Sequence, residues 1–411
     1  MTLTKLATYN DQMVRNGPDH MEKCMTTSEQ PLAPTPPMGW NSWNMFGSTI
    51  HEDSVRATAD VLVSSGLKDC GYNYVVIDDC WSTKVGRDGN GDLVADPEKF
   101  PSGIKALADY VHSLGLKIGI YSDAAHLTCA SYPGSFGFEE QDAQLWASWG
   151  IDFLKYDFCF APTDQATAID RYTRMGEALR KTKRQFLYSL CEWGGRSPQL
   201  WGRSVGGHMW RVTGDIFDSW VDIWVAPHKY YGVGIDTAID IAANLAEYAG
   251  PDAWNDLDML VVGLKGKGQI SGGGLSFIEY QTHMSLWTIA CSPLMIGCDI
   301  RNMDRDTTSL LTNREVLAVN QDSLGIAGRR VKQTGTCEIW KKPLADGSLA
   351  VALINRGSIG SDLSLRASDI GLLDTPKSVR NLWAQADIAE FGEAWQTRIQ
   401  PHETLLLKIK A

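Results

Sequence analysis

The chain repeats one arrangement along most of its length: a short, continuously apolar run ends at an acidic residue, and an amphipathic stretch follows. Seven such acidic ends lie between residues 78 and 299, and consecutive ends are 23 to 45 positions apart. Continuous apolar runs are typical of strands buried on both faces, and this spacing is typical of strand–helix units. With an opening run there are eight predicted strands, at residues 38–43, 74–77, 118–121, 153–156, 186–191, 209–214, 253–257 and 294–298.

Eight such units predict an α/β fold, a (β/α)8 TIM barrel over residues 31–325. The stretches 52–65, 102–114, 167–181 and 237–249 carry apolar residues at helical spacing and are the predicted connecting helices. The carboxyl ends of all strands meet at one rim of such a barrel, where catalytic residues lie. Helix capping explains one or two of the acidic ends, but not the whole set, which is Asp78 with Asp79, Asp123, Asp157, Glu192, Asp215, Asp258 and Asp299.

The sequence changes character after residue 324. Short strand-like runs at 330–341, 348–355, 361–365, 378–383 and 403–409 are separated by turn residues, and Asp346-Gly347 is a hairpin signal. We expect a separate C-terminal antiparallel β-sandwich domain over residues 326–411. Residues 1–30 are polar and are expected to form a loosely ordered extension.

Charge and composition narrow the class of protein. The 411 residues carry a net charge of −11 with no basic cluster, which argues against nucleic acid and anionic membranes as partners and favours a neutral substrate. No run of 18 apolar residues predicts a membrane span. No secretory signal is visible, so we expect a cytoplasmic protein, with secretion as the alternative. Nothing in the sequence indicates the oligomeric state.

We expect neither a metal ion nor a cofactor. The loop 87–92 is acidic, but Leu93 and Lys99 stand where a calcium-binding EF-hand needs Gly and Glu, so a hairpin is predicted there. The eight His form no zinc-binding spacing, and the nine Cys include no CxxC pair. The glycine-rich run 271–274 lacks the Lys-Ser/Thr of a phosphate-binding loop and is interpreted as a flexible loop.

Two positioned carboxyl groups suffice to cleave a glycosidic bond, one as nucleophile or base and the other as proton donor. Asp157 suits the first role, because Lys155 lies two residues earlier on the same strand face and favours the ionised carboxylate. A purely structural ion pair is the alternative. Asp215 suits the second role, because its apolar neighbours raise a carboxyl pKa. The alternative is that Asp215 caps a helix over 216–224.

The adjacent acids Asp78 and Asp79 follow a predicted strand directly. Buried carboxylates need hydrogen-bond donors, and sugar hydroxyls are suitable ones. Trp43 and Trp81 are candidates for an apolar wall beside the sugar, with ordinary core packing as the alternative for both.

At these residues the chain resembles glycoside hydrolase family 27, the α-galactosidase and α-N-acetylgalactosaminidase group. Six motifs occur in the family's order between residues 35 and about 325, and the C-terminal strands fit the family's tail. The motifs are MGWNSW at 38–43, GYNYVVIDDCW at 71–81, IYSD at 120–123, LKYD at 154–157, CEWG at 191–194 and WNDLDML at 254–260.

The resemblance implies a retaining double displacement, with Asp157 as the nucleophile and Asp215 as the acid/base. It further implies a disulfide beside the nucleophile between Cys129 and Cys159. The remaining residues that it places around the sugar are Trp43, Asp78, Asp79, Tyr121, Lys155, Glu192, Arg211 and Asp258.

Within this family, the resemblance favours terminal α-linked galactose of oligosaccharides as the substrate. The family's N-acetylgalactosaminidases have a small residue in place of Glu192, and its β-L-arabinopyranosidases lose one acid of the Asp78–Asp79 pair. These two sister specificities are the near alternatives, and an inactive carbohydrate-binding barrel is the distant one. Two departures from the family are Ser48, where many members have a Cys that pairs with the one at Cys80, and Phe158, whose ring is expected to narrow the leaving-group side.

Overall fold

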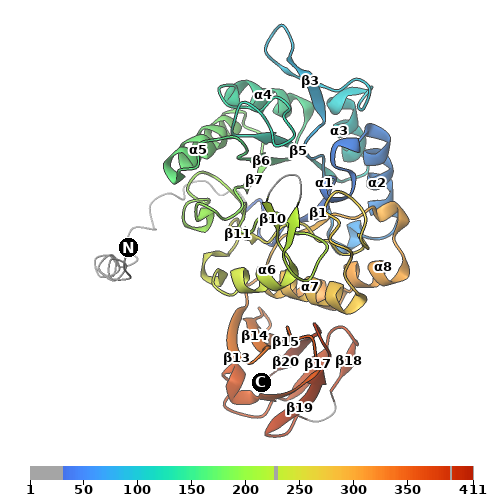
Figure 1. Cartoon of the computed structure of the whole chain (residues 1–411), viewed down its shortest axis with the longest axis vertical. Helices are drawn as coiled ribbons and strands as arrows, with labels where there is room; N and C mark the ends of the chain where they lie inside the picture. The colour runs from blue at the N-terminus through green and yellow to red at the C-terminus, as the bar shows by residue number, and fades with distance from the viewer. Residues whose placement is uncertain (1–30, 226–229, 389–390, 411) are drawn as a thin grey trace, which may run out of the picture. The chain divides into compact units, whose positions relative to one another are not determined.

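A computed structural model of the chain describes residues 31–225, 230–388 and 391–410. The extension expected at 1–30 lies outside the described residues. Eight parallel strands form one curled sheet in the order β11-β8-β7-β6-β5-β2-β1-β12 (Figure 1). Their bounds are β1 (Met38–Asn41), β2 (Tyr74–Val76), β5 (Lys117–Asp123), β6 (Phe153–Asp157), β7 (Leu187–Cys191), β8 (Met209–Arg211), β11 (Trp254–Asp256) and β12 (Leu294–Ile296).

The ring of strands closes just beyond β11. Leu260 forms a parallel bridge with Ile296 of β12, and the Leu260 amide donates to the Met295 carbonyl at 2.7 Å. The eight predicted runs therefore correspond one to one with the eight barrel strands, and the predicted barrel is confirmed. Within the ring, Asp123, Asp157 and Cys191 are register partners, so β5, β6 and β7 end at one level.

The helices pack outside the strands, and several begin where a side chain accepts a backbone N–H. Asp164 caps α5, and Ser276 with Glu279 forms a capping box at the start of α7. No helix of the described residues is long and apolar enough to cross a membrane. The helices are α1 (Trp43–Phe46), α2 (Glu52–Ser64), α3 (Gly103–Ser113), α4 (Glu139–Trp149), α5 (Gln165–Lys181), α6 (Ile235–Ala242), α7 (Phe277–Ile289), α8 (Arg305–Leu311) and α9 (Arg314–Asn320).

Two hairpins interrupt the strand–helix order. The first joins β3 (Ser82–Arg87) to β4 (Leu93–Ala95) through the acidic loop, where Asp88 accepts the amides of Asn90 and Asp92, as the hairpin prediction requires. The second joins β9 (Ile223–Val225) to β10 (Tyr230–Gly232). The helix considered over 216–224 is absent, because Ile216 bridges Val233 and the chain then enters β9.

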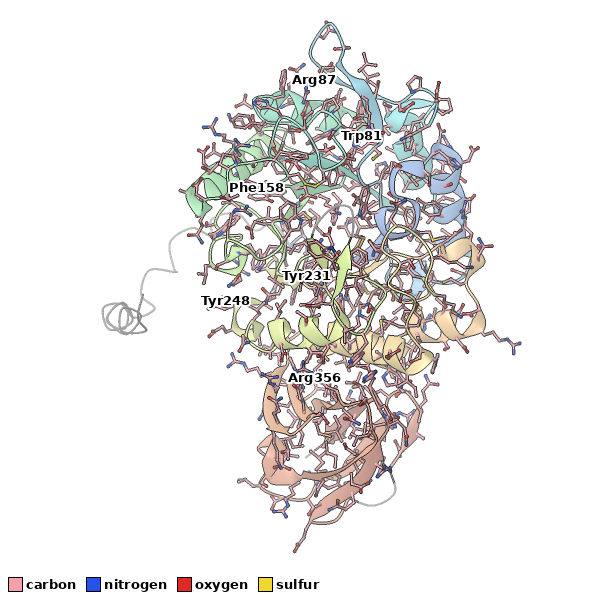
Figure 2. All side chains as sticks on the ribbon, in the orientation of Figure 1. Trp81, Arg87, Phe158, Tyr231, Tyr248 and Arg356 are labelled. Carbon is pink, nitrogen blue, oxygen red and sulfur yellow. A yellow bond between two sulfur atoms is a disulfide. The ribbon has the colours of Figure 1, made fainter. Side chains whose placement is uncertain are left out.

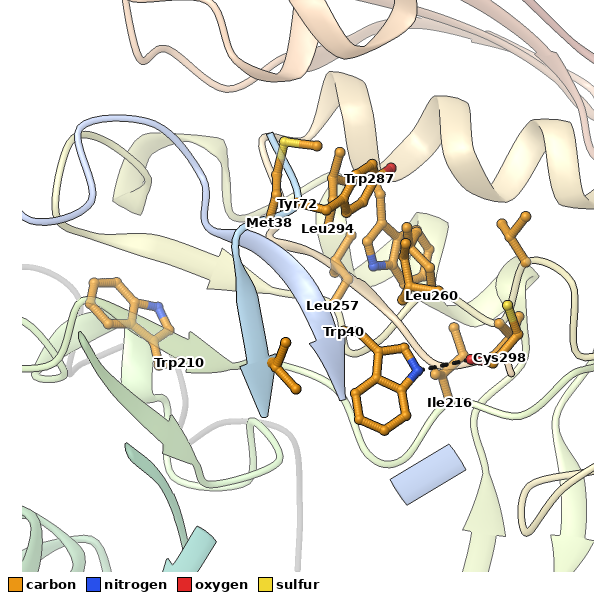
Figure 3. Packing of buried hydrophobic residues seen from close by; sticks show 14 of the residues in the cluster. Met38, Trp40, Tyr72, Trp210, Ile216, Leu257, Leu260, Trp287, Leu294 and Cys298 are labelled. Carbon is orange, nitrogen blue, oxygen red and sulfur yellow. Dashed lines mark hydrogen bonds between the residues drawn. The ribbon is translucent and has the colours of Figure 1, made fainter. Parts of the chain in front are cut away.

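Large aromatic side chains fill the space between the barrel strands and the helices. Trp40 is fully buried, and its Nε1 donates to the Cys298 carbonyl at 2.9 Å (Figure 3). Trp287 of α7 packs in the same cluster, and its Nε1 donates to the Asp258 carbonyl at 2.7 Å. Core packing thus accounts for several of the tryptophans, including Trp40, Trp146, Trp210, Trp254, Trp287 and Trp340.

The C-terminal part is an antiparallel β-sandwich, as predicted. One sheet has the order β13-β14-β15-β20-β17-β18, and β16 pairs with β19. The predicted strand 330–341 is wrong in one respect: Gly335, with φ of +60°, turns the chain and divides it into a hairpin. β18 and β19 were not predicted. The strands are β13 (Arg329–Thr334), β14 (Cys337–Pro343), β15 (Leu349–Asn355), β16 (Ser361–Arg366), β17 (Ser378–Asn381), β18 (Ala386–Asp387), β19 (Ala394–Ile399) and β20 (Thr404–Lys410).

Arg356 links the sandwich to the barrel (Figure 2). Its guanidinium donates to Asp236 Oδ1 and Asp240 Oδ1 of α6, both at 2.7 Å, and to the fully buried Glu338 Oε1 of β14 at 3.0 Å. These three carboxylates raise the pKa of Arg356, so the cation is held firmly in its charged form. One side chain therefore neutralises acids from both domains.

We expect Arg356→Ala to lower the free energy of unfolding by about 2 kcal/mol, because hydrogen bonds to charged groups are lost and buried Glu338 loses one of its partners. Thermal unfolding of the full chain measures the effect. The matched control is Arg398→Ala, which removes an exposed pair with Asp362 and an exposed hydrogen bond to the Gly360 carbonyl and should cost less than about 0.5 kcal/mol. Equal stability of the two variants would contradict the bridging role.

Candidate active site

A pocket of about 420 Å³ opens at the carboxyl ends of the barrel strands. Four of the residues that line it lie on β5, β6 and β8, and seven more lie within three residues after the end of β1, β2, β7 or β11. The lining residues are Trp43, Asn44, Asp78, Asp79, Tyr121, Cys129, Lys155, Asp157, Trp193, Arg211, Asp215, Asp258, Met259 and Ile270.

Asp157 is the last residue of β6 and lies almost fully buried in this pocket. Its Oδ2 accepts from the Tyr121 hydroxyl at 3.0 Å, and its Oδ1 accepts from the Phe158 amide at 2.9 Å. Burial raises its pKa to about 7, while the positive charge of Lys155 opposes that rise and the negative charge of Asp215 adds to it. Asp157 is thus fixed in orientation and titrates near neutral pH.

Lys155 shares the pocket face with Asp157, as predicted from the strand alternation, but it forms its ion pair with another acid. Its Nζ contacts Asp78 Oδ2 at 2.7 Å, and Asn41 Nδ2 donates to the same oxygen at 2.8 Å. The neighbouring acid Asp79 accepts the amides of Cys80 and Ala130. The Asp78–Asp79 pair therefore turns into the pocket, with each carboxylate held by donors of the protein.

Arg211, at the end of β8, connects two further acids. Its Nη2 lies 3.1 Å from Asp215 Oδ1 and 2.9 Å from Asp258 Oδ2. The sequence spacing did not require the pairing with Asp215. Arg211 and Asp258 are buried, whereas the side chain of Asp215 is 39% exposed. Burial raises the pKa of Asp258 to about 6, although Arg211 opposes the rise. Asp215 is the more accessible partner of this group.

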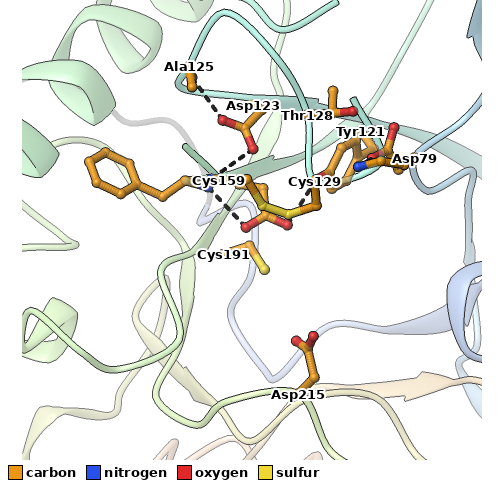
Figure 4. The surroundings of a disulfide bond; sticks show 12 residues. Asp79, Tyr121, Asp123, Ala125, Thr128, Cys129, Cys159, Cys191 and Asp215 are labelled. Atoms are coloured by element: carbon orange, nitrogen blue, oxygen red, sulfur yellow. Dashed lines mark hydrogen bonds between the residues drawn. A yellow bond between two sulfur atoms is a disulfide. The ribbon is translucent and has the colours of Figure 1, made fainter. Parts of the chain in front are cut away.

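Cys129 and Cys159 form a disulfide (Figure 4). Cys129 lines the pocket, and Asp123 accepts the Cys159 amide at 2.9 Å. Asp215 points toward the disulfide from a different segment of the chain. Asp123, Asp157 and the two sulfurs are close enough to resemble a metal site, but each sulfur is bonded to the other and offers no thiolate. That no metal is required stays a prediction.

Glu192 does not line the pocket. Its side chain is fully buried, and Arg196, four residues later, pairs with its Oε1 at 2.7 Å. Burial raises the pKa of Glu192, and Arg196 opposes that rise. The other oxygen, Oε2, is buried and has no hydrogen-bond partner among the described residues. The residues on either side of Glu192 contact the pocket instead. Cys191 Sγ accepts from Nη1 of the pocket residue Arg211 at 3.6 Å, and Trp193 lines the pocket.

The expectation for Phe158 is wrong, and the alternatives considered for Trp81 (core packing) and for one acidic strand end (helix capping) hold. Phe158 stacks on Tyr172 in the core and is 1% exposed, so its ring does not narrow the pocket. Trp81 is also a core residue. Asp299 caps the short 3-10 helix 300–302 and pairs with Arg301. Cys80 forms no disulfide in the described part of the chain, as the change at Ser48 predicts.

Asn44, Trp193, Met259 and Ile270 line the pocket but were not assigned to it from the sequence. Trp193 and Met259 lie inside the motifs CEWG and WNDLDML, so their place in these motifs could have indicated that they line the pocket. Ile270 had no such signal, because it directly precedes the glycine-rich run 271–274 that was interpreted as a flexible loop. Hydrogen bonds to one acid hold the chain on both sides of this run. Asp218, which is fully buried, accepts the amides of Gly266 and Leu275 and the Tyr280 hydroxyl.

Comparisons with known proteins agree with this geometry. Residues 35–322 match the family model of α-galactosidase A, and residues 334–409 match the α-galactosidase C-terminal β-sandwich domain. The α-galactosidase of Cyamopsis tetragonoloba is 48% identical over 358 residues, which cover 87% of this chain and 81% of that protein.

Two solved structures extend the comparison. α-Galactosidase I from Mortierella vinacea superposes with a TM-score of 0.85 at 38% identity, covering 92% of this chain and 97% of that one. The Saccharomyces cerevisiae α-galactosidase solved with raffinose gives 0.83 at 30% identity, covering 93% and 100%. The chain therefore belongs to the α-galactosidase A family of glycoside hydrolases, glycoside hydrolase family 27, and carries that family's C-terminal β-sandwich domain.

Proposed function

We propose that this protein is a retaining, exo-acting α-galactosidase that removes terminal α-linked galactose from oligosaccharides and galactosides. The observation that carries the proposal is that two acids with different surroundings, Asp157 and Asp215, line the same pocket. Asp157 is buried and held by two hydrogen bonds, whereas Asp215 is partly exposed. The two roles follow from access and not from pKa, because burial raises the pKa of Asp157. Asp157 is fixed in orientation, which suits an attacking group, and Asp215 is open to the leaving group and to water, which suits a group that gives and takes protons.

In the first step, a carboxylate oxygen of Asp157 attacks the anomeric carbon while Asp215 gives its proton to the departing oxygen. The bond from the anomeric carbon to that oxygen breaks, and a galactosyl ester of Asp157 forms. In the second step, Asp215 takes a proton from water, and the hydroxide oxygen displaces Asp157. The exposed side of Asp215 gives the leaving group and the water access to that carboxyl.

Recognition of the sugar falls to the polar groups opposite these acids. Carboxylates accept hydrogen bonds from hydroxyls and Lys155 donates them, so Asp78, Asp79 and Lys155 form a mixed acceptor–donor surface for a galactose. Trp43 offers an apolar face to the ring. Support also comes from the relatives named α-galactosidases and from the yeast structure with raffinose. Glu192 adds no support for galactose, because its side chain is buried beside Arg196.

Asp157→Asn should lower kcat/KM on p-nitrophenyl α-galactoside by roughly a thousandfold or more, since an amide cannot form the ester. Steady-state release of nitrophenol measures the loss. Asp109→Asn is the matched control, because Asp109 lies exposed on α3 and pairs only with Lys105. Activity of the Asp157 variant within tenfold of the control would exclude Asp157 as nucleophile.

The wild-type protein should hydrolyse the α-galactoside and leave the corresponding α-N-acetylgalactosaminide essentially uncleaved, with or without a chelator. The first sugar released should be the α-anomer, because two displacements restore the starting configuration. Proton NMR during the first minutes of reaction distinguishes the anomers. Initial release of the β-anomer would rule out the retaining mechanism, and preference for the acetamido sugar would favour the sister specificity.

Stability should depend on pH through Asp157. Its raised pKa means that the folded protein holds this proton more tightly than the unfolded chain does, so the free energy of unfolding falls as the pH rises from about 4 to about 7. Asn has no such proton to lose. The variant should therefore match the wild-type Tm at pH 4 and exceed it by roughly a few degrees at pH 8.

Asp304 provides a control of opposite sign. Lys265 lowers its pKa, so the ionised carboxylate stabilises the fold above the ordinary Asp pKa and that contribution is lost on acidification. Asp304→Asn should lower the Tm at pH 8. Thermal unfolding of the wild type, Asp157→Asn and Asp304→Asn at pH 4 and pH 8 tests both effects. If Asp157→Asn is less stable than the wild type at pH 8, the ionised carboxylate stabilises the fold and the prediction is wrong.

A further inference from the structure

The β9–β10 hairpin carries two large aromatic side chains that the fold leaves in solvent. Trp224 is 53% exposed and Tyr231 is 67% exposed. They are direct cross-strand partners, and their ring centroids lie 5.0 Å apart at an interplanar angle of 65°. Two exposed aromatic rings on a two-stranded ribbon form an apolar surface that ordinary folding does not require, and such surfaces mark binding sites.

Backbone hydrogen bonds join the base of this hairpin to the segment that contains Asp215. The Val233 amide donates to the Asp215 carbonyl at 2.8 Å, and the Phe217 amide donates to the Val233 carbonyl at 2.9 Å. Phe217 packs against Gly232 so closely that a Cβ at Gly232 would lie 2.2 Å from its ring. The position of β10 is thus set by the residues that also position the proposed acid/base.

The two rings lie on the same side of the ribbon as Val233. Side chains alternate along an extended chain, so Tyr231 and Val233 point to one side and Gly232 to the other. Val233 packs beside Gly214, where a Cβ on Gly214 would lie 3.2 Å from Val233 Cγ2. At about 3.3 Å per residue, Tyr231 stands roughly 7 Å along the strand from Val233. The aromatic pair therefore begins close to Asp215, on the side of Gly214. Figure 2 shows Tyr231 in front of the barrel.

We propose that Trp224 and Tyr231 form a platform for the pyranose ring to which the terminal galactose is attached. The inference rests on the proposed function, because a proton donor at Asp215 places the leaving group on its side of the pocket. A leaving group that is itself a sugar has apolar C–H faces that pack on aromatic rings, and its hydroxyls remain hydrated. The preferred substrates are then galactosides of other sugars rather than galactosides with small leaving groups.

The test compares two substrates that differ only beyond the galactose. Raffinose offers a sugar as leaving group, whereas α-galactosyl fluoride releases a single atom that cannot reach the hairpin. The double variant Trp224→Ala/Tyr231→Ala should lose roughly tenfold in kcat/KM for raffinose, mainly through KM, and keep the wild-type value for the fluoride. Trp224→Phe/Tyr231→Phe should retain the raffinose activity within about twofold, because aromatic faces remain. Leu373→Ala, at a fully exposed position of the sandwich, is the control.

The outcomes separate the two proposals. A wild-type protein that cleaves neither substrate would refute the α-galactosidase function itself. If the wild type cleaves both and the alanine variant cleaves raffinose unimpaired, the platform is refuted. Equal losses on both substrates would also refute it, since they would show that the hairpin supports Asp215 and does not bind the leaving group.

Discussion

The central physical constraint on this protein is the collection of five carboxyl groups around one small pocket with only two cations among them. Ionised carboxylates that line one pocket repel one another, and burial adds the free-energy cost of removing them from water. Lys155 and Arg211 offset part of that cost, because Lys155 pairs with Asp78 and Arg211 bridges Asp215 and Asp258. The closed ring of parallel strands supplies the rigidity, because it fixes the ends of β2, β6, β8 and β11 relative to one another.

Backbone amides complete the stabilisation. Asp157 accepts the amide of the residue after it, and Asp258 accepts those of Met259 and Ile216. These donors cannot move away as a flexible side chain can, so they orient each carboxylate without taking up all of its lone pairs. The turns that follow β2, β6 and β11 therefore each have two consequences. Each turn ends its strand, and it aims an amide back at the acid that stands there.

The strands of the barrel were predictable because strands buried on both faces require continuous apolar runs, and the acids at their ends followed from the topology. Directions of side chains beyond the strand ends were not predictable. Glu192 turns into the interior, where Arg196, four residues later in a turn, pairs with it. Phe158, the residue after Asp157, packs in the core beside Tyr172. Arg196 is near in the sequence, but its spacing alone does not predict the pair, and Tyr172 lies 14 residues beyond Phe158. The division of residues 330–341 into a hairpin depends on one glycine with positive φ.

Asp215 differs from the other acids of the pocket in what positions it. The others end a barrel strand or follow one within three residues, whereas Asp215 stands four residues beyond β8, in the irregular segment that leads through β9 and β10 to α6. Its main chain pairs with Val233 and its side chain with Arg211. Under the proposed mechanism, the strand ends build the galactose side of the pocket, and a connecting segment builds the leaving-group side. Because no barrel strand runs through that segment, it can be altered with little cost to the barrel, and the choice of leaving group is structurally separable from the choice of terminal sugar.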